Sequence, residues 1–251
     1  MFEKGGYKLA KIILVASGKG GAGKSTVSTL LGEAFACKKC PALLVELDSG
    51  LRSLDVALGV SENILFDMGD IIRGSCQIRD AVVPCRFCEG LSLIPASAKP
   101  ISVTSEILEK IFAELSDDFE YIILDCPAGI GNALENAAKC TDLALVVATP
   151  DPSSIRGART AGALLASAGV SERRLVIERC PQKAKNLSPI NNLDEIIDGT
   201  ELRLIGVIWE DPMTRSAMDS GKMLSCESPN YKTFRDLSER IRGEKVPLGF
   251  K

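Results

Sequence analysis

The sequence predicts a three-layer α/β fold, in which a mainly parallel, twisted sheet carries helices on both faces. Short apolar runs alternate with longer segments of helical spacing along the chain, as strands and crossover helices do. Several of these runs have no polar face, which is typical of strands buried on both sides. The expected strands are 11–17, 42–47, 91–95, 121–125, 143–149, 175–179 and 204–209, and the expected helices are 24–36, 64–73, 105–116, 133–140, 155–168, 193–198 and 230–242.

We expect one domain spanning residues 1–251, because the alternation is continuous and no repeat or linker interrupts it. Residues 1–9 are predicted to be a loose lead-in. The Pro- and Asn-rich stretch 181–192 is predicted to be a mobile loop.

The composition excludes several kinds of chemistry. The chain has no histidine, so histidine bases, Ser-His-Asp triads and histidine metal sites are excluded. A net charge of −3 gives no overall basic signal for nucleic acid. Nine cysteines, with neither a secretion signal nor an apolar run long enough to span a bilayer, predict reduced thiols in a cytoplasmic protein.

A glycine-rich loop follows the first expected strand. Residues 18–26 read GKGGAGKST and fit the pattern G-x-x-x-x-G-K-[ST], whose backbone N–H groups surround a nucleotide's phosphates. The preceding strand and following helix favour this interpretation over a simple glycine turn, because the helix N-terminus adds positive potential. The predicted nucleotide-binding residues are Gly18, Gly20, Gly21, Ala22, Gly23, Lys24, Ser25 and Thr26.

A second lysine, Lys19, follows the first glycine of this loop. A phosphate loop does not need a lysine there for its own nucleotide. From that position the side chain could reach a phosphate bound by a facing subunit. We therefore expect a homodimer that forms with ATP.

Two apolar runs end in aspartate, at Asp48 and Asp125. Ligands of open α/β sheets bind at the C-terminal ends of strands. Magnesium needs few protein ligands, so the Ser25 hydroxyl and the Asp125 carboxylate suffice to hold Mg²⁺ beside the phosphates. The alternative, that each aspartate only caps a turn, is weakened by the glycine loop.

The chain resembles the MinD/ParA family of ATPases with a deviant phosphate loop, and within it the MinD group. The similarity covers nearly the whole length in order. The matching segments are SGKGGAGKST (17–26), LDSGLRSLD (47–55), LIPAS (93–97), DCPAGI (125–130), TPDPSSIR (149–156) and GVIWED (206–211).

The resemblance implies a slow, partner-stimulated ATP hydrolase whose sandwich dimer acts as a switch in cell-division site selection or in positioning another assembly. A protein partner or activator is therefore expected. The implied roles are contact with the β- and γ-phosphates for Lys24, Mg²⁺ ligation for Ser25 and Asp125, proximity to the α-phosphate for Thr26, contact across the dimer for Lys19, positioning of the attacking water for Asp48, and γ-phosphate sensing by the N–H of Gly129.

The chain departs from the family pattern at three places. Glu46 stands where the family usually has aspartate, and Glu178 where it commonly has asparagine or threonine. Residues 243–251 contain Pro247 and Gly249 where MinD proteins carry an amphipathic membrane-binding helix. The departure at Glu178 leaves the contacts to the base open, and the one at residues 243–251 leads us to expect no intrinsic membrane binding.

Two C-x-x-C pairs, Cys37/Cys40 and Cys85/Cys88, each precede an expected strand. If these strands are parallel neighbours, four thiolates at one end of the sheet could hold Zn²⁺. This leaves open a metallocluster-maturation or metal-insertion NTPase, against the simpler alternative of two chance pairs. Cys126 is expected to be a buried core residue.

The last alternative is a ParA-type partition ATPase that binds DNA. Its basic face would be formed by Arg156, Arg159, Arg173 and Arg174. Scattered surface arginines are common, so we do not expect DNA as a partner. Trp209, the single tryptophan, is expected to pack in the core.

Overall fold

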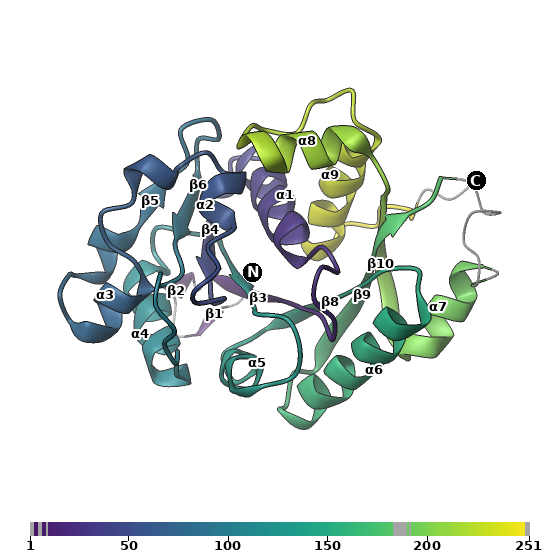
Figure 1. Ribbon diagram of the computed structural model, residues 1–251, viewed down its shortest axis with the longest axis horizontal. Coiled ribbons are helices and arrows are strands. Elements are labelled where there is room, and N and C mark those ends of the chain that lie inside the picture. The colour runs from purple at the N-terminus through teal and green to yellow at the C-terminus, as the bar shows by residue number, and fades with distance from the viewer. Residues whose placement is uncertain (1–2, 5–6, 9, 183–189, 191, 249–251) are drawn as a thin grey trace.

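The computed structural model describes residues 3–4, 7–8, 10–182, 190 and 192–248 (Figure 1). Its main sheet has eight strands. These are β3 (Lys11–Ala16), β4 (Ala42–Glu46), β5 (Val83–Pro84), β6 (Leu91–Ile94), β7 (Tyr121–Asp125), β8 (Leu143–Ala148), β9 (Glu172–Cys180) and β10 (Arg203–Trp209).

The strand order is β10-β9-β8-β3-β7-β4-β6-β5, and every neighbouring pair is parallel except β5 with β6. The central strand β3 lies between β7 and β8, so the phosphate loop that follows β3 leaves from the middle of the sheet. In the register of β4 with β7, Glu46 lies opposite Asp125. The predicted fold class is confirmed.

Helices cover both faces of the sheet (Figure 1). Alternate residues of β3 face opposite layers: Ile13 and Val15 pack with α1, and Ile12 and Leu14 pack in the other core. The first face carries α1 (Lys24–Ala36), α2 (Leu54–Ala57), α8 (Pro212–Ser220) and α9 (Pro229–Ile241). The second carries α3 (Met68–Arg73), α4 (Ser105–Leu115), α5 (Asn132–Ala138), α6 (Pro152–Ser167) and α7 (Leu193–Thr200).

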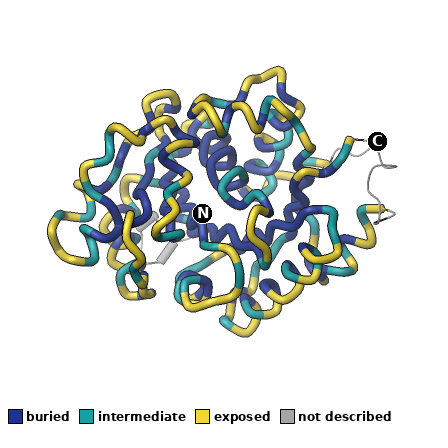
Figure 2. Tube along the Cα trace, viewed as in Figure 1, coloured by how far each residue is buried: buried dark blue, intermediate teal, exposed yellow. Residues whose placement is uncertain are grey.

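Burial follows these layers (Figure 2). Every residue of β4, β7 and β8 is buried, which explains why these strands read as continuous apolar runs. Helix α1 has the predicted bounds, and the Phe35 ring at its end stacks on Tyr121 of β7 with centroids 3.8 Å apart. This contact fixes α1 against the sheet.

The predicted helix 64–73 is shorter in the structure. Asp67 adopts an extended conformation and its carboxylate accepts hydrogen bonds from the N–H groups of Gly69 and Asp70, so α3 begins only at Met68. A capping aspartate also sets the start of α6, which lies before the predicted residue 155. Asp151 caps the helix and Pro152 occupies its first position, which lengthens the predicted 155–168.

Several short elements were not predicted. They are α2, α8, β5, the 3₁₀ turns Ser61–Asn63 and Ile78–Ala81, and the antiparallel pair β1 (Glu3–Lys4) and β2 (Tyr7–Lys8). The pair corrects the prediction that 1–9 is only a loose lead-in. Helix α8 had a readable signal, since Asp211 caps it and Pro212 opens it.

The predicted mobile loop 181–192 falls largely on residues 183–189 and 191, which lie outside the described residues. Within the described ranges, no helix combines the length and apolar character needed to cross a membrane.

Glu33 provides a test of buried charge in α1. Its side chain is 7% exposed and accepts a hydrogen bond from the Leu224 N–H (3.3 Å), and burial raises the pKa of its carboxyl from 4.5 to about 7. Because the folded-state pKa is raised, the carboxyl's contribution to stability is complete below pH 4.5 and is lost as pH rises through 7. We expect Glu33→Gln to gain on the order of 1–3 kcal/mol relative to wild type between pH 4.5 and pH 8, measured by urea unfolding.

Glu62→Gln, the same substitution at an exposed carboxylate, is the control. The prediction is contradicted if the difference in unfolding free energy between Glu33→Gln and wild type is the same at pH 4.5 and pH 8.

Candidate functional site

The phosphate loop, residues 18–26, joins β3 to α1 at the centre of the sheet. Two of its glycines are required by geometry. A Cβ on Gly18 would lie 2.1 Å from the carbonyl oxygen of Gly157 in α6. Gly23, which precedes α1, has φ 94°, a left-handed conformation that other residues rarely adopt. The loop is therefore a tightly supported turn that ends at a helix N-terminus, an arrangement suited to anions.

Ser25 and Asp125 meet beneath this loop. The Ser25 hydroxyl donates to Oδ2 of Asp125 (2.8 Å), and the Ser28 hydroxyl donates to Oδ1 (2.8 Å). Asp125 is 1% exposed, and burial raises the pKa of its carboxyl to about 6. One hydroxyl and one carboxylate are hard oxygen donors that fit Mg²⁺, whose charge would favour ionised Asp125 in this buried position.

Glu46 has a role that the sequence did not reveal. It is fully buried, and its carboxylate accepts hydrogen bonds from the Ser53 N–H (2.6 Å), the Leu54 N–H (3.1 Å) and the Ala96 N–H (3.3 Å). The longer side chain thus ties the end of β4 to the start of α2. Ser53 in turn lies 3.3 Å from the Ser25 hydroxyl, which connects the segment after β4 to the phosphate loop.

Asp48 lies two residues beyond β4 and is partly buried. The Leu47 N–H donates to the carbonyl oxygen of Asp125 (2.9 Å), which extends the pairing of β4 with β7. This contact brings Asp48 to the same edge of the sheet as the Ser25–Asp125 pair.

Lys19 and Gly129 both have partners within the chain. Lys19 Nζ lies 3.0 Å from Oδ1 of Asp151, and both side chains are partly exposed at the rim of the loop. Hydrogen bonds, including that from Lys19, hold the pKa of Asp151 well below its usual range against the opposing effect of burial. The Gly129 N–H donates to the Ser17 carbonyl (3.1 Å), so contact with a γ-phosphate requires this bond to open.

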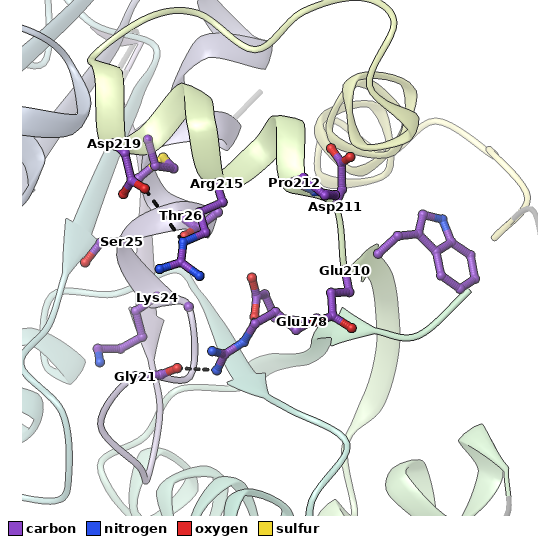
Figure 3. A pocket seen from close by; sticks show the side chains of 14 residues that line it. Gly21, Lys24, Ser25, Thr26, Glu178, Glu210, Asp211, Pro212, Arg215 and Asp219 are labelled. Atoms are coloured by element: carbon purple, nitrogen blue, oxygen red, sulfur yellow. Dashed lines mark hydrogen bonds and ion pairs between the residues drawn. The ribbon is translucent and has the colours of Figure 1, made fainter. Parts of the chain in front are cut away.

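A cavity of about 930 Å³ extends from the phosphate loop toward the ends of β9 and β10 (Figure 3). Lys24, Ser25 and Thr26 line one end of it. Sequence analysis singled out Glu178 and Trp209 near the other end, and it missed the α8 residues because that helix was not predicted. The other end is lined by residues from the ends of β9 and β10 and from α8. They are Glu178, Arg179, Trp209, Glu210, Asp211, Pro212, Arg215, Met218 and Asp219.

A family model described as an AAA domain matches residues 10–167 of this chain. The septum site-determining protein MinD of Bacillus subtilis (strain 168) is 35% identical over 246 residues, which cover 96% of this chain and 92% of that protein. The chain belongs to the MinD/ParA family of ATPases.

Solved structures agree with this membership. The MinC:MinD cell division protein complex of Aquifex aeolicus contains a chain that is 30% identical, with a TM-score of 0.88 and coverage of 96% of this chain and 99% of that one. The septum site-determining protein MinD of Pyrococcus horikoshii OT3, complexed with Mg-ADP, is 24% identical and shares the fold with a TM-score of 0.82, over 95% of this chain and 100% of that one.

The predicted four-cysteine zinc site does not form. The two strands that follow the C-x-x-C pairs are parallel neighbours, as predicted: Ala42 of β4 pairs with Leu91 of β6. Cys37 and Cys88 lie close enough for their side chains to hydrogen-bond, but Cys40 Sγ donates to the Lys38 carbonyl and Cys85 Sγ donates to the Leu58 carbonyl. Within the described residues, no three His, Cys, Asp or Glu side chains are grouped so that they could hold a metal ion.

Burial raises the pKa of the thiols of Cys85 and Cys88, and it also raises the pKa of the more exposed Cys37 thiol. Since the described residues form no metal-holding group, nothing in the structure favours the metal-insertion interpretation. Cys126 is fully buried in the core, as predicted.

The structure also shows the surroundings of the arginines considered for DNA binding and of the single tryptophan. Arg159 pairs with Glu201 and Arg174 with Glu172, so two of the four arginines considered for DNA are partly neutralised. Trp209 packs against the core but also lines the cavity, which is a wider role than the core position predicted for it.

Proposed function

We propose that this chain is a MinD-like ATPase in which ATP binding closes a two-fold homodimer and hydrolysis reopens it, as a switch in division-site placement. The observation that carries the proposal is the hydrogen-bonded Ser25–Asp125 pair directly beneath a phosphate loop, with Lys19 at the rim of that loop. Sequence relatives across nearly the whole chain bear the name septum site-determining protein.

Each part of the site has a proposed task. Lys24 neutralises the β- and γ-phosphates, and Thr26 lies at the α-phosphate side. Ser25 and Asp125 hold Mg²⁺, which neutralises developing charge when bound. Asp48 orients the attacking water, since the chain has no histidine to do so. This chemistry needs positioned charges and no covalent nucleophile.

The switch itself is proposed to involve two residues that have intrachain partners in the structure. Lys19 would exchange Asp151 for a phosphate held by the facing subunit, and the N–H of Gly129 would exchange the Ser17 carbonyl for the γ-phosphate. Both exchanges make the closed state depend on ATP. A protein partner would then bind the closed state, as MinC pairs with MinD in the complex of Aquifex aeolicus.

The mass of the protein in solution tests the proposal. With Mg²⁺ and ADP we expect the 26.8 kDa chain to be monomeric, and with Mg²⁺ and a slowly hydrolysed ATP analogue we expect twice that mass, by light scattering. An identical mass with both nucleotides, when both bind, would refute the dimer switch.

A further inference from the structure

Two thiols from distant parts of the sequence lie close together at the end of α1. Cys37 directly follows this helix, and Cys88 lies in the loop 85–90 between β5 and β6. Their side chains are close enough to hydrogen-bond. The backbone agrees with this contact, because a Cβ on Gly90 would lie 3.8 Å from the Cβ of Ala36, the last residue of α1. The loop 85–90 therefore packs on the C-terminal end of that helix.

The two thiols differ in their access to solvent. Cys37 is exposed, whereas Cys88 is only 3% exposed. A reagent in solution can therefore react with Cys37 directly, while Cys88 is shielded from it. An accessible cysteine beside a second cysteine that can displace a group from it is the usual arrangement of a thiol pair that forms a disulfide.

The other two cysteines of the C-x-x-C pairs are directed toward carbonyl groups. Cys40 is 5% exposed and its Sγ lies 3.7 Å from the carbonyl oxygen of Lys38. Cys85 is 9% exposed and its Sγ lies 3.8 Å from the carbonyl oxygen of Leu58. The geometry thus favours a bond between the two C-x-x-C segments over a bond within either of them.

We propose that Cys37 and Cys88 form a reversible disulfide in the presence of a low-molecular-weight disulfide, and that this bond ties the end of α1 to the loop 85–90. The Cys37 thiolate attacks the small disulfide RSSR, which leaves a mixed disulfide on Cys37 and releases RS⁻. The Cys88 thiolate then attacks Sγ of Cys37 and releases the second RS⁻. Two protein thiols are oxidised, RSSR is reduced to two RSH, and the two thiol protons end on the released thiols.

The surroundings of the pair make this exchange slow near neutral pH. Burial and the charge of Glu33 in α1 raise the pKa of Cys37, against the hydrogen bond with Cys88 and the charge of Arg235 in α9. Burial, with the charges of Cys37, Glu33 and Cys85, also raises the pKa of Cys88. Because the thiolate is the nucleophile, the rate of disulfide formation should rise with pH.

The disulfide is expected to stabilise the fold without disturbing the phosphate loop. It would close a loop of 51 residues, which restricts the unfolded chain. Cys37 follows the last of the 13 residues of α1, so it lies roughly 20 Å from the phosphate loop at the other end of the helix. The inference is therefore independent of the proposed nucleotide switch.

Peptide mapping tests which cysteines pair. We expect the full-length protein, incubated with glutathione disulfide at pH 8, alkylated and digested with trypsin, to yield one cross-linked pair of peptides that contains Cys37 and Cys88. Trypsin sites after Lys38, Lys39 and Arg86 place the four cysteines of the two C-x-x-C pairs on separate peptides. Every other pairing among the four therefore has its own mass.

Thermal unfolding tests what the bond does. We expect the Tm of the oxidised protein to exceed that of the reduced protein by about 5–10 °C, and dithiothreitol to reverse the shift. Cys37→Ser and Cys88→Ala should lose both the cross-linked peptides and the shift. Cys226→Ser, a change at another exposed cysteine, is the matched control and should keep both. The Tm of each reduced variant establishes that it is folded.

Each contrary result identifies the step that fails. A disulfide between Cys37 and Cys40 or between Cys85 and Cys88, a glutathione adduct that stays on Cys37, or no reaction would overturn the pairing. An unchanged Tm after cross-linking would overturn the stabilising role.

Calorimetry with ADP and Mg²⁺ separates the disulfide from the nucleotide site. We expect the affinity of the oxidised protein to lie within about threefold of that of the reduced protein, because the bond forms at the opposite end of α1. Loss of ADP binding on oxidation alone would overturn that independence. Failure of both forms to bind ADP would refute the proposed nucleotide site and leave the disulfide standing.

Discussion

Replacing Lys24 with alanine is expected to abolish useful nucleotide binding, with ATP affinity falling on the order of 100-fold. Lys24 is the first residue of α1 and is 8% exposed, so it lies largely buried at the loop where we propose that the phosphates bind. No other lysine lines the cavity among the described residues. Calorimetry with Mg²⁺ and a slowly hydrolysed ATP analogue measures the loss.

Lys19→Ala is expected to behave differently, although the two lysines stand five positions apart. Lys19 is paired with Asp151 at the rim of the loop and is 47% exposed, so it contributes little to binding within one subunit. We expect ATP affinity within about threefold of wild type. Dimer formation should be lost, and turnover should fall by roughly 10³-fold, as when a charge supplied from a facing subunit is removed.

The surface lysine Lys110 in α4 provides the control, because Lys110→Ala should bind, dimerise and turn over as wild type does. If Lys19→Ala still forms dimers with ATP and hydrolyses it normally, Lys19 does not act across the interface. If Lys24→Ala binds ATP normally, the assignment of the phosphate site is wrong.

The second large effect is expected at Asp48. Asp48→Ala should bind ATP and dimerise but hydrolyse ATP at least about 100-fold more slowly, because no positioned base remains to orient the water. The chain has no histidine to substitute, and Glu46, the nearest buried carboxylate along the strand, is engaged with the N–H groups of Ser53, Leu54 and Ala96.

Phosphate release measures the rate, and light scattering after ATP addition follows the dimer. The variant should show a dimer that persists where the wild-type dimer decays. Asp55→Asn is a useful control, since this buried aspartate in α2 lies on the same segment after β4 but is proposed to have no role with the water. Wild-type turnover by Asp48→Ala would remove Asp48 from the mechanism.

The phosphate loop could be recognised from sequence because its geometry is local. Glycines that allow left-handed or closely packed backbone, as at Gly18 and Gly23, are adjacent in the chain to the lysine and serine they position. The strands could be located because residues buried on both faces leave continuous apolar runs. The bounds of α1 followed from the glycine before it and the apolar spacing within it.

The starts of helices that are set by a capping side chain were harder to predict. Asp67 and Asp151 each set a helix start by turning a carboxylate onto backbone N–H groups, and the apolar spacing of the surrounding residues carries little trace of this. Helix α8 was missed because its apolar face is small, although Asp211 and Pro212 marked its beginning.

By itself the sequence determined the fold class, the phosphate loop and the two carboxylates at the ends of β4 and β7, because contiguous motifs and strand periodicity record backbone geometry directly. Only the tertiary structure decided that the four cysteines form no metal-holding group among the described residues, that Glu46 ties β4 to α2, and that Glu178 lies against Gly23, 155 positions away in the chain. Each of these depends on which distant partner a side chain meets after packing. A residue's type and spacing do not specify that choice, because several orientations satisfy the same local pattern until burial and hydrogen bonding select one.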